Sequence, residues 1–156
     1  MSTTGTPAKS FMNSDKKKPV RLDNQLCFAL YAASNAVEQH YKTHLKAQDL
    51  TYTQYLVLMA LFEQDGISIS ALAERLEVSR GTMTPIIRTL EKKELLVRET
   101  MEDDERQKIV SLTAKGRRVW IKSCDVSATV FTHTGLTQSE ADEVIRLCAK
   151  ISRSGN

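Results

Sequence analysis

The sequence changes its hydrophobic period part-way along the chain, and this change constrains the fold more than any other feature. Up to Leu95 the apolar residues recur at the three-and-four spacing of amphipathic helices. Directly afterwards the segments LLVRET and QKIVSLT alternate apolar and polar residues, with the polar stretch MEDDER between them. This alternation predicts a β-hairpin.

Two short helical segments stand directly before the expected hairpin. They are SISALAERLEVS and SRGTMTPIIRTLEKKEL, joined by the tight connection EVS. Two short helices with such a connection indicate a helix-turn-helix, and the hairpin that follows supplies its wing.

Longer helices are expected on both sides of this unit. The first runs from Asp23 to Lys46. Capping boxes open two others, at Thr51 with Gln54 and at Thr137 with Glu140, and Thr113 caps a long helix between them. The predicted fold is mainly α with a small β-hairpin wing, a winged helix-turn-helix flanked by N- and C-terminal helices.

Composition excludes several classes of protein. The chain of 156 residues is long enough for one domain. It has no run of about eighteen apolar residues and its N-terminus is too polar for a secretory signal, so we expect a soluble cytoplasmic protein without contact to a membrane. The three cysteines Cys27, Cys124 and Cys148 suit neither a disulfide framework nor a zinc site, and reduced thiols are expected.

The positive charge is small overall, so its position matters more than its amount. The net charge is +3, which hardly argues for nucleic acid by itself. Residues 1–20 lack periodicity and are expected to form a disordered arm. Its lysine run, 16–18, either stays solvated or touches DNA phosphates.

The second helix of the expected helix-turn-helix carries hydroxyl and guanidinium groups away from its apolar face. Arginine and threonine can read major-groove edges and hold phosphates. The candidates for DNA contact on this helix are Ser79, Arg80, Gly81, Thr82, Thr84, Pro85 and Arg88. A helix start at Thr82 would place Pro85 harmlessly in the first turn, whereas a start at Ser79 would not, and the sequence leaves both open.

The expected wing adds further positive charge. Arg98 lies on one strand, Arg106 at the tip and Lys108 on the other strand, where they can meet an adjacent groove or the DNA backbone. Acidic residues stand between them. We expect Asp104 to pair with either Arg98 or Arg106 and hold the shape of the wing, while the other acids point to solvent.

The stretch DDERQKIVSLTAKG resembles the wing of the MarR family of bacterial transcription regulators. In that family a D-x-R element is followed by an L-T-x-x-G helix start; Asp104 and Arg106 supply the first, and Leu112, Thr113 and Gly116 the second. The resemblance covers about residues 22–125. It implies a homodimer whose terminal helices interdigitate, and two recognition helices that enter successive major grooves of a palindromic double-stranded DNA operator.

The resemblance divides the chain into four parts. They are a disordered arm at 1–20, a dimerisation helix at 21–48, a winged helix-turn-helix DNA-binding region at 49–113 and dimerisation helices at 114–156. Two positions depart from the pattern. Glu94 stands where the family usually has a glycine before the wing, and residues 79–82 read SRGT instead of the DSGT of similar proteins.

Three segments, LDNQLCFALYAAS, LTYTQYLVLMAL and GTMTPIIRTLE, resemble the organic-hydroperoxide-sensing repressors of the OhrR type. These carry a reactive cysteine at the place of Cys27, with tyrosines that match Tyr31, Tyr41 and Tyr52. The resemblance implies that Tyr41 and Tyr52 reach the thiolate from the partner subunit. Tyrosine hydroxyls and a helix N-terminus both favour the nucleophilic thiolate.

Some relatives resolve the oxidised cysteine with a second thiol on the long C-terminal helix of the other subunit. Cys124 lies on that helix, though earlier than the family's resolving position. Oxidised Cys27 is therefore expected to pair either with Cys124 or with a small cellular thiol. Cys148 is expected to pack in the last helix.

The sequence thus predicts a dimeric repressor that senses organic hydroperoxides by oxidation of Cys27 and then releases its operator. The alternative is a MarR-type repressor that responds to a noncovalent phenolic or aromatic-acid ligand. A thiol peroxidase is the third hypothesis, but no arginine and threonine accompany the cysteine, and we expect neither enzyme activity nor a cofactor. His40 and His44 have a metal-binding spacing without an evident third ligand, so no metal is expected.

Overall fold

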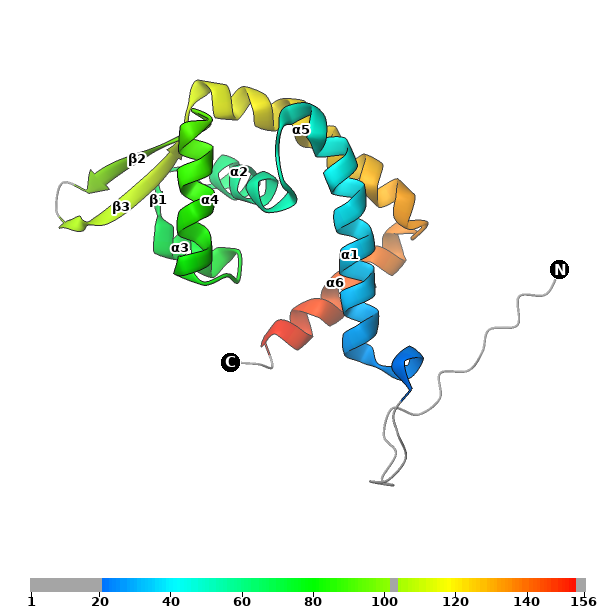
Figure 1. The fold of residues 1–156 in the computed structure, drawn as a ribbon. Helices are drawn as coiled ribbons and strands as arrows, with labels where there is room; N and C mark the ends of the chain where they lie inside the picture. The colour runs from blue at the N-terminus through cyan, green and yellow to red at the C-terminus, as the bar shows by residue number, and fades with distance from the viewer. Residues whose placement is uncertain (1–20, 102–103, 154–156) are drawn as a thin grey trace. The chain divides into compact units, whose positions relative to one another are not determined.

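The structure is a computed structural model that describes residues 21–101 and 104–153, with the backbone alone at 104–106 (Figure 1). The arm expected at 1–20 lies outside the described residues. Contacts divide the chain after Ala36 into two units.

The described part of the first unit is helical and exposed. A short 3-10 helix, Leu22–Asn24, precedes α1, Leu26–Leu45, which continues into the second unit. The helix predicted from Asp23 to Lys46 is confirmed. Between residues 21 and 36 no described side chain is fully buried, although Leu26, Phe28 and Tyr31 are large and apolar.

The second unit contains the predicted helix-turn-helix. After a second 3-10 helix, its first helices are α2, Tyr52–Glu63, α3, Ile69–Arg75, and α4, Arg80–Lys92. The capping box of Thr51 and Gln54 is present at the start of α2. The hydroxyl of Ser79 accepts the N–H of Thr82 at 3.1 Å, which caps α4.

The start of α4 settles the position of Pro85. The helix begins at Arg80, so Pro85 lies inside it and not in its first turn. Its missing N–H leaves the carbonyl of Gly81 without the usual intrahelical donor. Both residues are exposed, so water can supply that hydrogen bond.

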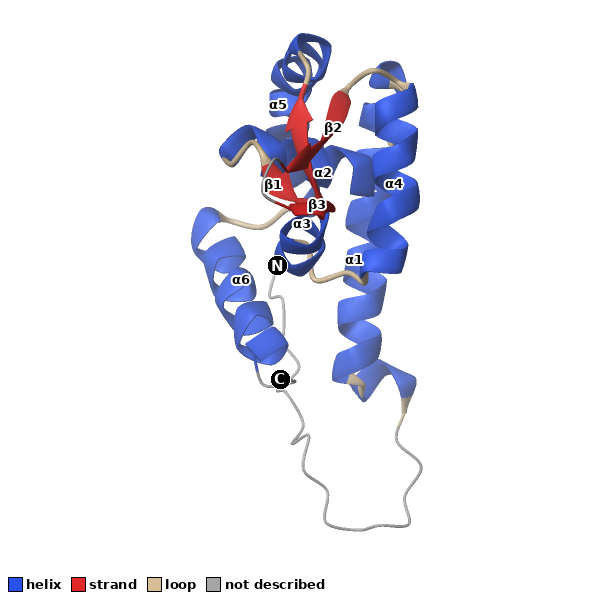
Figure 2. Ribbon diagram, turned by 90° about the vertical axis from the view of Figure 1, so that its left-hand side faces the viewer, coloured by secondary structure: helices blue, strands red, loops and turns tan. Residues whose placement is uncertain are grey.

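The wing is part of a three-stranded antiparallel sheet of order β1-β3-β2 (Figure 2). Its strands are β1, Ile67–Ser68, β2, Leu96–Met101, and β3, Asp104–Leu112. The two long strands form the predicted hairpin, with Leu96 opposite Leu112. The strand β1 was not predicted, because two residues are too few to show an alternating pattern.

Two further helices follow the sheet as predicted. They are α5, Ala114–Thr134, and α6, Gln138–Arg153. The hydroxyl of Thr113 accepts the N–H of Gly116 at 2.9 Å and caps α5. At α6 the side chains and backbone N–H groups of Thr137 and Glu140 bond reciprocally, so this capping box is also present.

The end of α4 shows how the chain manages without a glycine before the wing. Glu94 adopts the left-handed conformation, with φ of 61°, which costs about 1 kcal/mol for a residue with a Cβ atom. Its N–H donates to the carbonyl of Glu91, and that of Leu95 to the carbonyl of Leu90, each at 2.9 Å. These bonds close the helix and turn the chain into β2.

The core of the second unit lies among α2, α3, α4, the sheet and the first part of α5. Its largest fully buried side chains include Tyr55, Leu58, Leu61, Leu72, Met83, Ile87, Leu90, Leu96 and Val110. Gly116 lets α5 approach the sheet closely, since a Cβ atom there would lie 1.9 Å from the carbonyl oxygen of Leu95. In contrast, α6 has no buried residue.

Candidate DNA-binding surface and thiol site

Helix α4 has one buried face and one exposed face. Met83, Ile87 and Leu90 are buried in the core. The predicted contact residues Ser79, Arg80, Gly81, Thr82, Pro85 and Arg88 are exposed, and Thr84 is half-buried. The hydroxyl of Thr84 donates to the carbonyl of Arg80 at 2.9 Å, so its proton is already used within the helix.

A basic hollow lies where α3, α4 and β3 meet. Its volume is about 340 Å³, and it is lined by Ser68, Ile69, Ser70, Arg80, Gln107 and Lys108. Two predicted contact residues, Arg80 and Lys108, thus come together from the recognition helix and the wing. The described lining contains no carboxylate, so the hollow suits an anionic group such as a DNA phosphate.

The wing arginine Arg98 has a partner that the sequence did not suggest. Its guanidinium bonds the carboxylate of Glu91 in the last turn of α4, at 3.1 and 2.6 Å. The side chains of Asp104 and Arg106 lie outside the described residues. The pairing of Asp104 with Arg98 or Arg106 therefore stays a prediction, and the contact that the structure describes for Arg98 is one between wing and helix.

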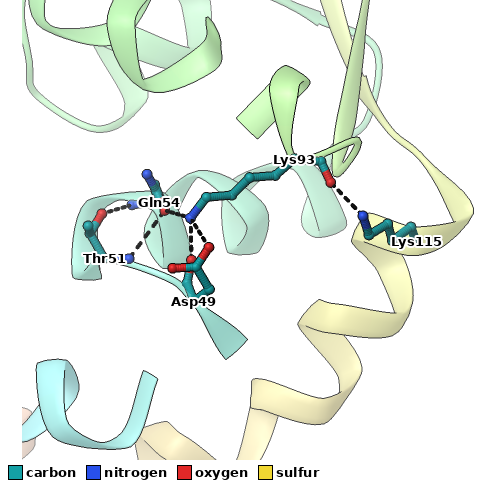
Figure 3. Close-up of polar contacts among 5 residues, drawn as sticks. All are labelled: Asp49, Thr51, Gln54, Lys93 and Lys115. Atoms are coloured by element: carbon teal, nitrogen blue, oxygen red, sulfur yellow. Dashed lines mark hydrogen bonds and ion pairs between the residues drawn. The ribbon is translucent and has the colours of Figure 1, made fainter. Parts of the chain in front are cut away.

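The C-terminal end of α4 is held by a polar network that the sequence analysis missed (Figure 3). The ammonium of Lys93 bonds the side-chain oxygen of Gln54 at 3.3 Å and the carboxylate of Asp49 at 3.0 Å, and it also donates to the carbonyl of Asp49. The ammonium of Lys115 donates to the carbonyl of Lys93 at 2.8 Å. The network ties α4 to the starts of α2 and α5.

The thiols lie in different surroundings. Cys27 is the second residue of α1 in the first unit, as the predicted helix start required, and it is exposed. Cys124 on α5 is also exposed, and its thiol donates to the carbonyl of Trp120 at 3.4 Å within the same helix. Cys148 on α6 is half-buried. All three are free thiols.

The second unit gathers a cluster of tyrosines. The ring centres of Tyr41 and Tyr52 are 4.5 Å apart, and those of Tyr41 and Tyr55 are 5.5 Å apart. The hydroxyl of Tyr41 donates to Ser127 Oγ at 3.3 Å, and the Tyr55 hydroxyl shares a hydrogen bond with the same oxygen at 2.6 Å. Two of the predicted tyrosines are therefore neighbours, whereas Tyr31 lies in the first unit and is exposed.

Tyr55 and Ser127 were not predicted to belong to this cluster. The spacing of Tyr52 and Tyr55 on one helix face was a signal for the first, but nothing marked Ser127 among the many hydroxyls of α5. Burial raises the pKa of Tyr52 and the pKa of Tyr55. For Tyr55 the hydrogen bond with Ser127 lowers the pKa and so partly offsets the effect of burial. Both phenols therefore stay protonated and remain hydrogen-bond donors at neutral pH.

Comparison with known proteins gives the family. Residues 50–108 match the model of the MarR family. SarZ of Staphylococcus aureus, an HTH-type transcriptional regulator, is 39% identical over 124 residues, which cover 80% of this chain and 84% of SarZ. The chain belongs to the MarR family. Its relatives are transcriptional regulators, so this MarR protein is a DNA-binding regulator and not an enzyme.

Solved MarR structures agree with the fold. The structure of reduced AbfR bound to DNA is 30% identical, with a TM-score of 0.73, and covers 86% of this chain and 94% of that one. CouR bound to a 23-mer DNA duplex is 25% identical to this chain, with a TM-score of 0.77, and the match covers 86% of this chain and 99% of CouR. The winged helix-turn-helix predicted from the sequence is confirmed.

The three histidines of this MarR protein come together in the second unit. The ring of His133 lies 5.0 Å from that of His40 and 5.7 Å from that of His44, between centres. A third histidine is thus nearby, although none was evident from the sequence. Within residues 21–101 and 104–153, however, no group of His, Cys, Asp or Glu side chains is arranged to hold a metal ion.

The helices of this MarR protein are also informative about membranes. Across the described ranges, no helix is both long enough and apolar enough to span a bilayer.

Proposed function

We propose that the protein is a dimeric MarR-family repressor that releases its operator when an organic hydroperoxide oxidises Cys27. The observation that carries this proposal is the exposed, free thiol of Cys27 in the first turn of α1. A thiol there is accessible to an oxidant. The neighbouring Leu26 and Phe28 offer an apolar surface that suits an organic hydroperoxide better than a small polar oxidant.

The DNA side of the proposal places α4 in the major groove. The exposed residues at its start, 79–82, then face base edges, with Thr84, Pro85 and Arg88 further along. Arg80 and Lys108 hold a phosphate in the basic hollow, and Arg106 is proposed as a further DNA contact of the wing. The solved structures of AbfR and CouR contain DNA, which supports this mode of binding for a similar chain.

The dimer in the proposal is formed by the terminal helices. Helix α6 has no buried residue, yet it carries the exposed apolar side chains Val144, Ile145, Leu147 and Ile151. A contiguous apolar face of this kind needs a partner. A second copy supplies one, and its two-fold symmetry matches a palindromic operator.

The chemistry of sensing begins with the thiolate of Cys27. Its sulfur attacks the outer oxygen of the hydroperoxide, the O–O bond breaks, and the alkoxide leaves and takes up a proton as the alcohol. Cys27 becomes a sulfenic acid, which condenses with a second thiol to a disulfide and water. That second thiol is Cys124 of the partner subunit or a small cellular thiol.

The tyrosines support the reduced state in this proposal. Tyr41 and Tyr52 of a second copy donate hydrogen bonds to the thiolate, and the raised pKa of Tyr52 keeps its proton in place. Tyr31 lies one helical turn after Cys27 on the same face of α1 and adds a third hydroxyl. Oxidation removes these bonds and so changes the spacing of the two DNA-reading heads, to which binding at two half-sites is sensitive.

The test is a DNA-binding titration on the promoter upstream of the protein's own gene, with one equivalent of cumene hydroperoxide. We expect wild type to be released and Cys27→Ser to stay bound, while both bind equally before oxidation. Cys124→Ser serves as the matched second thiol and is titrated with and without an added small thiol: release only when the small thiol is present assigns resolution to it. Retention of wild type on DNA after peroxide would contradict the proposal.

A noncovalent acid is the second candidate signal. It is favoured by a hollow of about 490 Å³ lined by Glu38, Lys42, Lys46, Asp49, Leu50, Thr51, Tyr52 and Lys93. Lys42 and Lys46 suit a carboxylate, whereas Lys93 is already bonded to Asp49. The ring of Tyr52 suits an aromatic body. Release of Cys27→Ser from DNA by salicylate would favour this candidate over oxidation.

A further inference from the structure

An ion pair bridges the turn between the recognition helix and the wing. Arg98 is the third residue of β2, and Glu91 lies in the last turn of α4. Nε of Arg98 donates to Oε1 of Glu91 at 3.1 Å, and a terminal nitrogen donates to Oε2 at 2.6 Å. Two parallel hydrogen bonds of this kind fix the relative orientation of both groups.

Arg98 and Glu91 each shift the pKa of the other toward its charged form. The bond from Arg98 lowers the pKa of the Glu91 carboxyl, and the bond to Glu91 raises the pKa of Arg98. The two side chains are only about one-third exposed, at 32% and 35%. Arg80 and Arg88 differ from Arg98, because within the described part of the chain neither forms an ion pair.

Arg98 also lies on the face of β2 that contacts α4. Residues two apart on a strand share a face, so Arg98 lies on the same face of β2 as Leu96, which is buried beside α4 in the core. All residues after Leu96 on β2 are exposed, Arg98 included, so hydrophobic burial does not hold this part of the strand. The contact with Glu91 therefore continues the attachment of β2 to α4 one step beyond the hydrophobic core.

We propose that Arg98 is a positioning residue for DNA reading, which holds the wing against the recognition helix through Glu91 and is not itself a phosphate ligand. This role differs from the DNA contact that its charge alone suggested. It concerns the reduced protein and DNA only. Its failure is therefore distinguishable from a failure of the peroxide proposal.

The experiment compares specific with non-specific binding of the full-length reduced protein. The probes are the duplex upstream of its own gene and a scrambled duplex of the same length, each titrated over a range of salt. The variants are Arg98→Gln, Arg98→Lys and Glu91→Gln, with Arg88→Gln as a matched arginine on α4. Thermal unfolding of each variant checks that it folds.

A positioning role predicts the same change in all three variants of the pair. Each lowers the ratio of specific to non-specific affinity by about fivefold, the size of coupling expected for an exposed pair with good geometry. Arg98→Lys fails like Arg98→Gln, because an ammonium cannot reproduce the two parallel bonds. The double variant Arg98→Gln with Glu91→Gln loses no more than either single variant, since both remove one interaction.

A phosphate ligand predicts the opposite pattern. Arg98→Gln then weakens both duplexes equally and lowers the slope of log affinity against log salt by about 0.9, as we expect of Arg88→Gln. Arg98→Lys keeps most of the affinity, and Glu91→Gln tightens binding because it frees the arginine. This pattern, in folded variants, would overturn the proposal.

Discussion

The winged region and the last helix of this MarR protein carry apolar side chains in opposite ways. Between Leu45 and Val130 the second unit buries a continuous core within one chain. Helix α6 has four large apolar side chains and buries none of them. The fold of the winged region is thus fixed by its own chain, whereas the apolar side chains of α6 stay exposed in the single chain.

This difference bears on where a signal can act. A region with its own core resists small perturbations, because its packing is fixed on all sides. The proposed sensor Cys27 lies instead in the exposed first unit, where no described side chain is buried. In the proposed dimer, chemistry there changes an interface between chains before it disturbs a core.

The largest expected effect is a loss of stability in the winged region itself. Gly116→Ala places a Cβ atom 1.9 Å from the carbonyl oxygen of Leu95, a backbone atom that cannot rotate away. We expect a loss of about 3 kcal/mol in the free energy of unfolding, measured with urea. Gly81→Ala is the control, since its nearest neighbour is 3.8 Å away. Equal unfolding midpoints for Gly116→Ala and wild type would refute the close approach.

A charge on α6 should weaken the proposed dimer and leave the winged region folded. Ile145 is 65% exposed in the single chain, and we expect Ile145→Glu to raise the dimer dissociation constant by about hundredfold, because a carboxylate is buried at the interface. Sedimentation measures this effect. Ser139→Glu adds the same charge at the start of α6, where the helix dipole favours it. A dimer of unchanged strength in Ile145→Glu would show that α6 pairs through another face.

The tyrosine cluster offers a smaller change inside the winged region. Ser127→Ala removes the partner of the fully buried Tyr55, and we expect a loss of about 1 to 2 kcal/mol in urea unfolding. Ser123→Ala is the matched control. Ser123 is also buried but bonds only the carbonyl of Val119 in its own helix, so its loss should be near zero. Equal losses in the two variants would count against a role for Ser127 in holding Tyr55.

Replacing the left-handed residue before the wing by glycine should raise the free energy of unfolding. Glu94 has φ of 61°, and Glu94→Gly should gain about 0.5 kcal/mol because glycine adopts this conformation without strain. The change also removes an exposed ion pair with Lys115 at 3.2 Å. Glu94→Ala removes that pair but keeps the Cβ atom, and it should show no gain. A gain in both variants would trace the effect to the charge.

The smallest effect concerns pH. The hydrogen bond from Arg98 lowers the pKa of Glu91, so the pair stabilises the folded protein above the ordinary pKa of a glutamate. This stabilisation is lost as the pH falls through the lowered pKa of Glu91. Urea unfolding of wild type should therefore weaken slightly more on acidification than that of Arg98→Gln. Parallel pH profiles would indicate that the pair adds nothing to stability.

Local signals in the sequence predicted most of the fold. The capping boxes at Thr51 and Thr137 depend on residues three positions apart, and both are present. The change of period after Leu95 likewise predicted the hairpin. These features depend on near neighbours in sequence, which a single sequence displays directly.

Features that depend on partners brought together by the fold were missed. The bond between Arg98 and Glu91 was not predicted, because it requires the turn at Glu94 to bring β2 back beside α4. Ser127 lies 72 residues from Tyr55, and its contact requires the packing of α5 on α2. The sequence does not decide where α4 starts, because Pro85 disfavours an early start and the Ser79 cap favours one. In the structure the helix starts at Arg80, and the serine cap and the exposed carbonyl of Gly81 offset the cost of the internal proline.

The single tryptophan of the chain has an optical consequence. Trp120 is 8% exposed, with its ring centre 5.1 Å from that of Tyr55 and 5.9 Å from that of Phe62. Its emission therefore reports from the contact between α5 and α2, one helical turn before Cys124. Unlabelled protein thus contains its own fluorescence reporter, and a stopped-flow trace can time any movement of α5 after a hydroperoxide or DNA is mixed in.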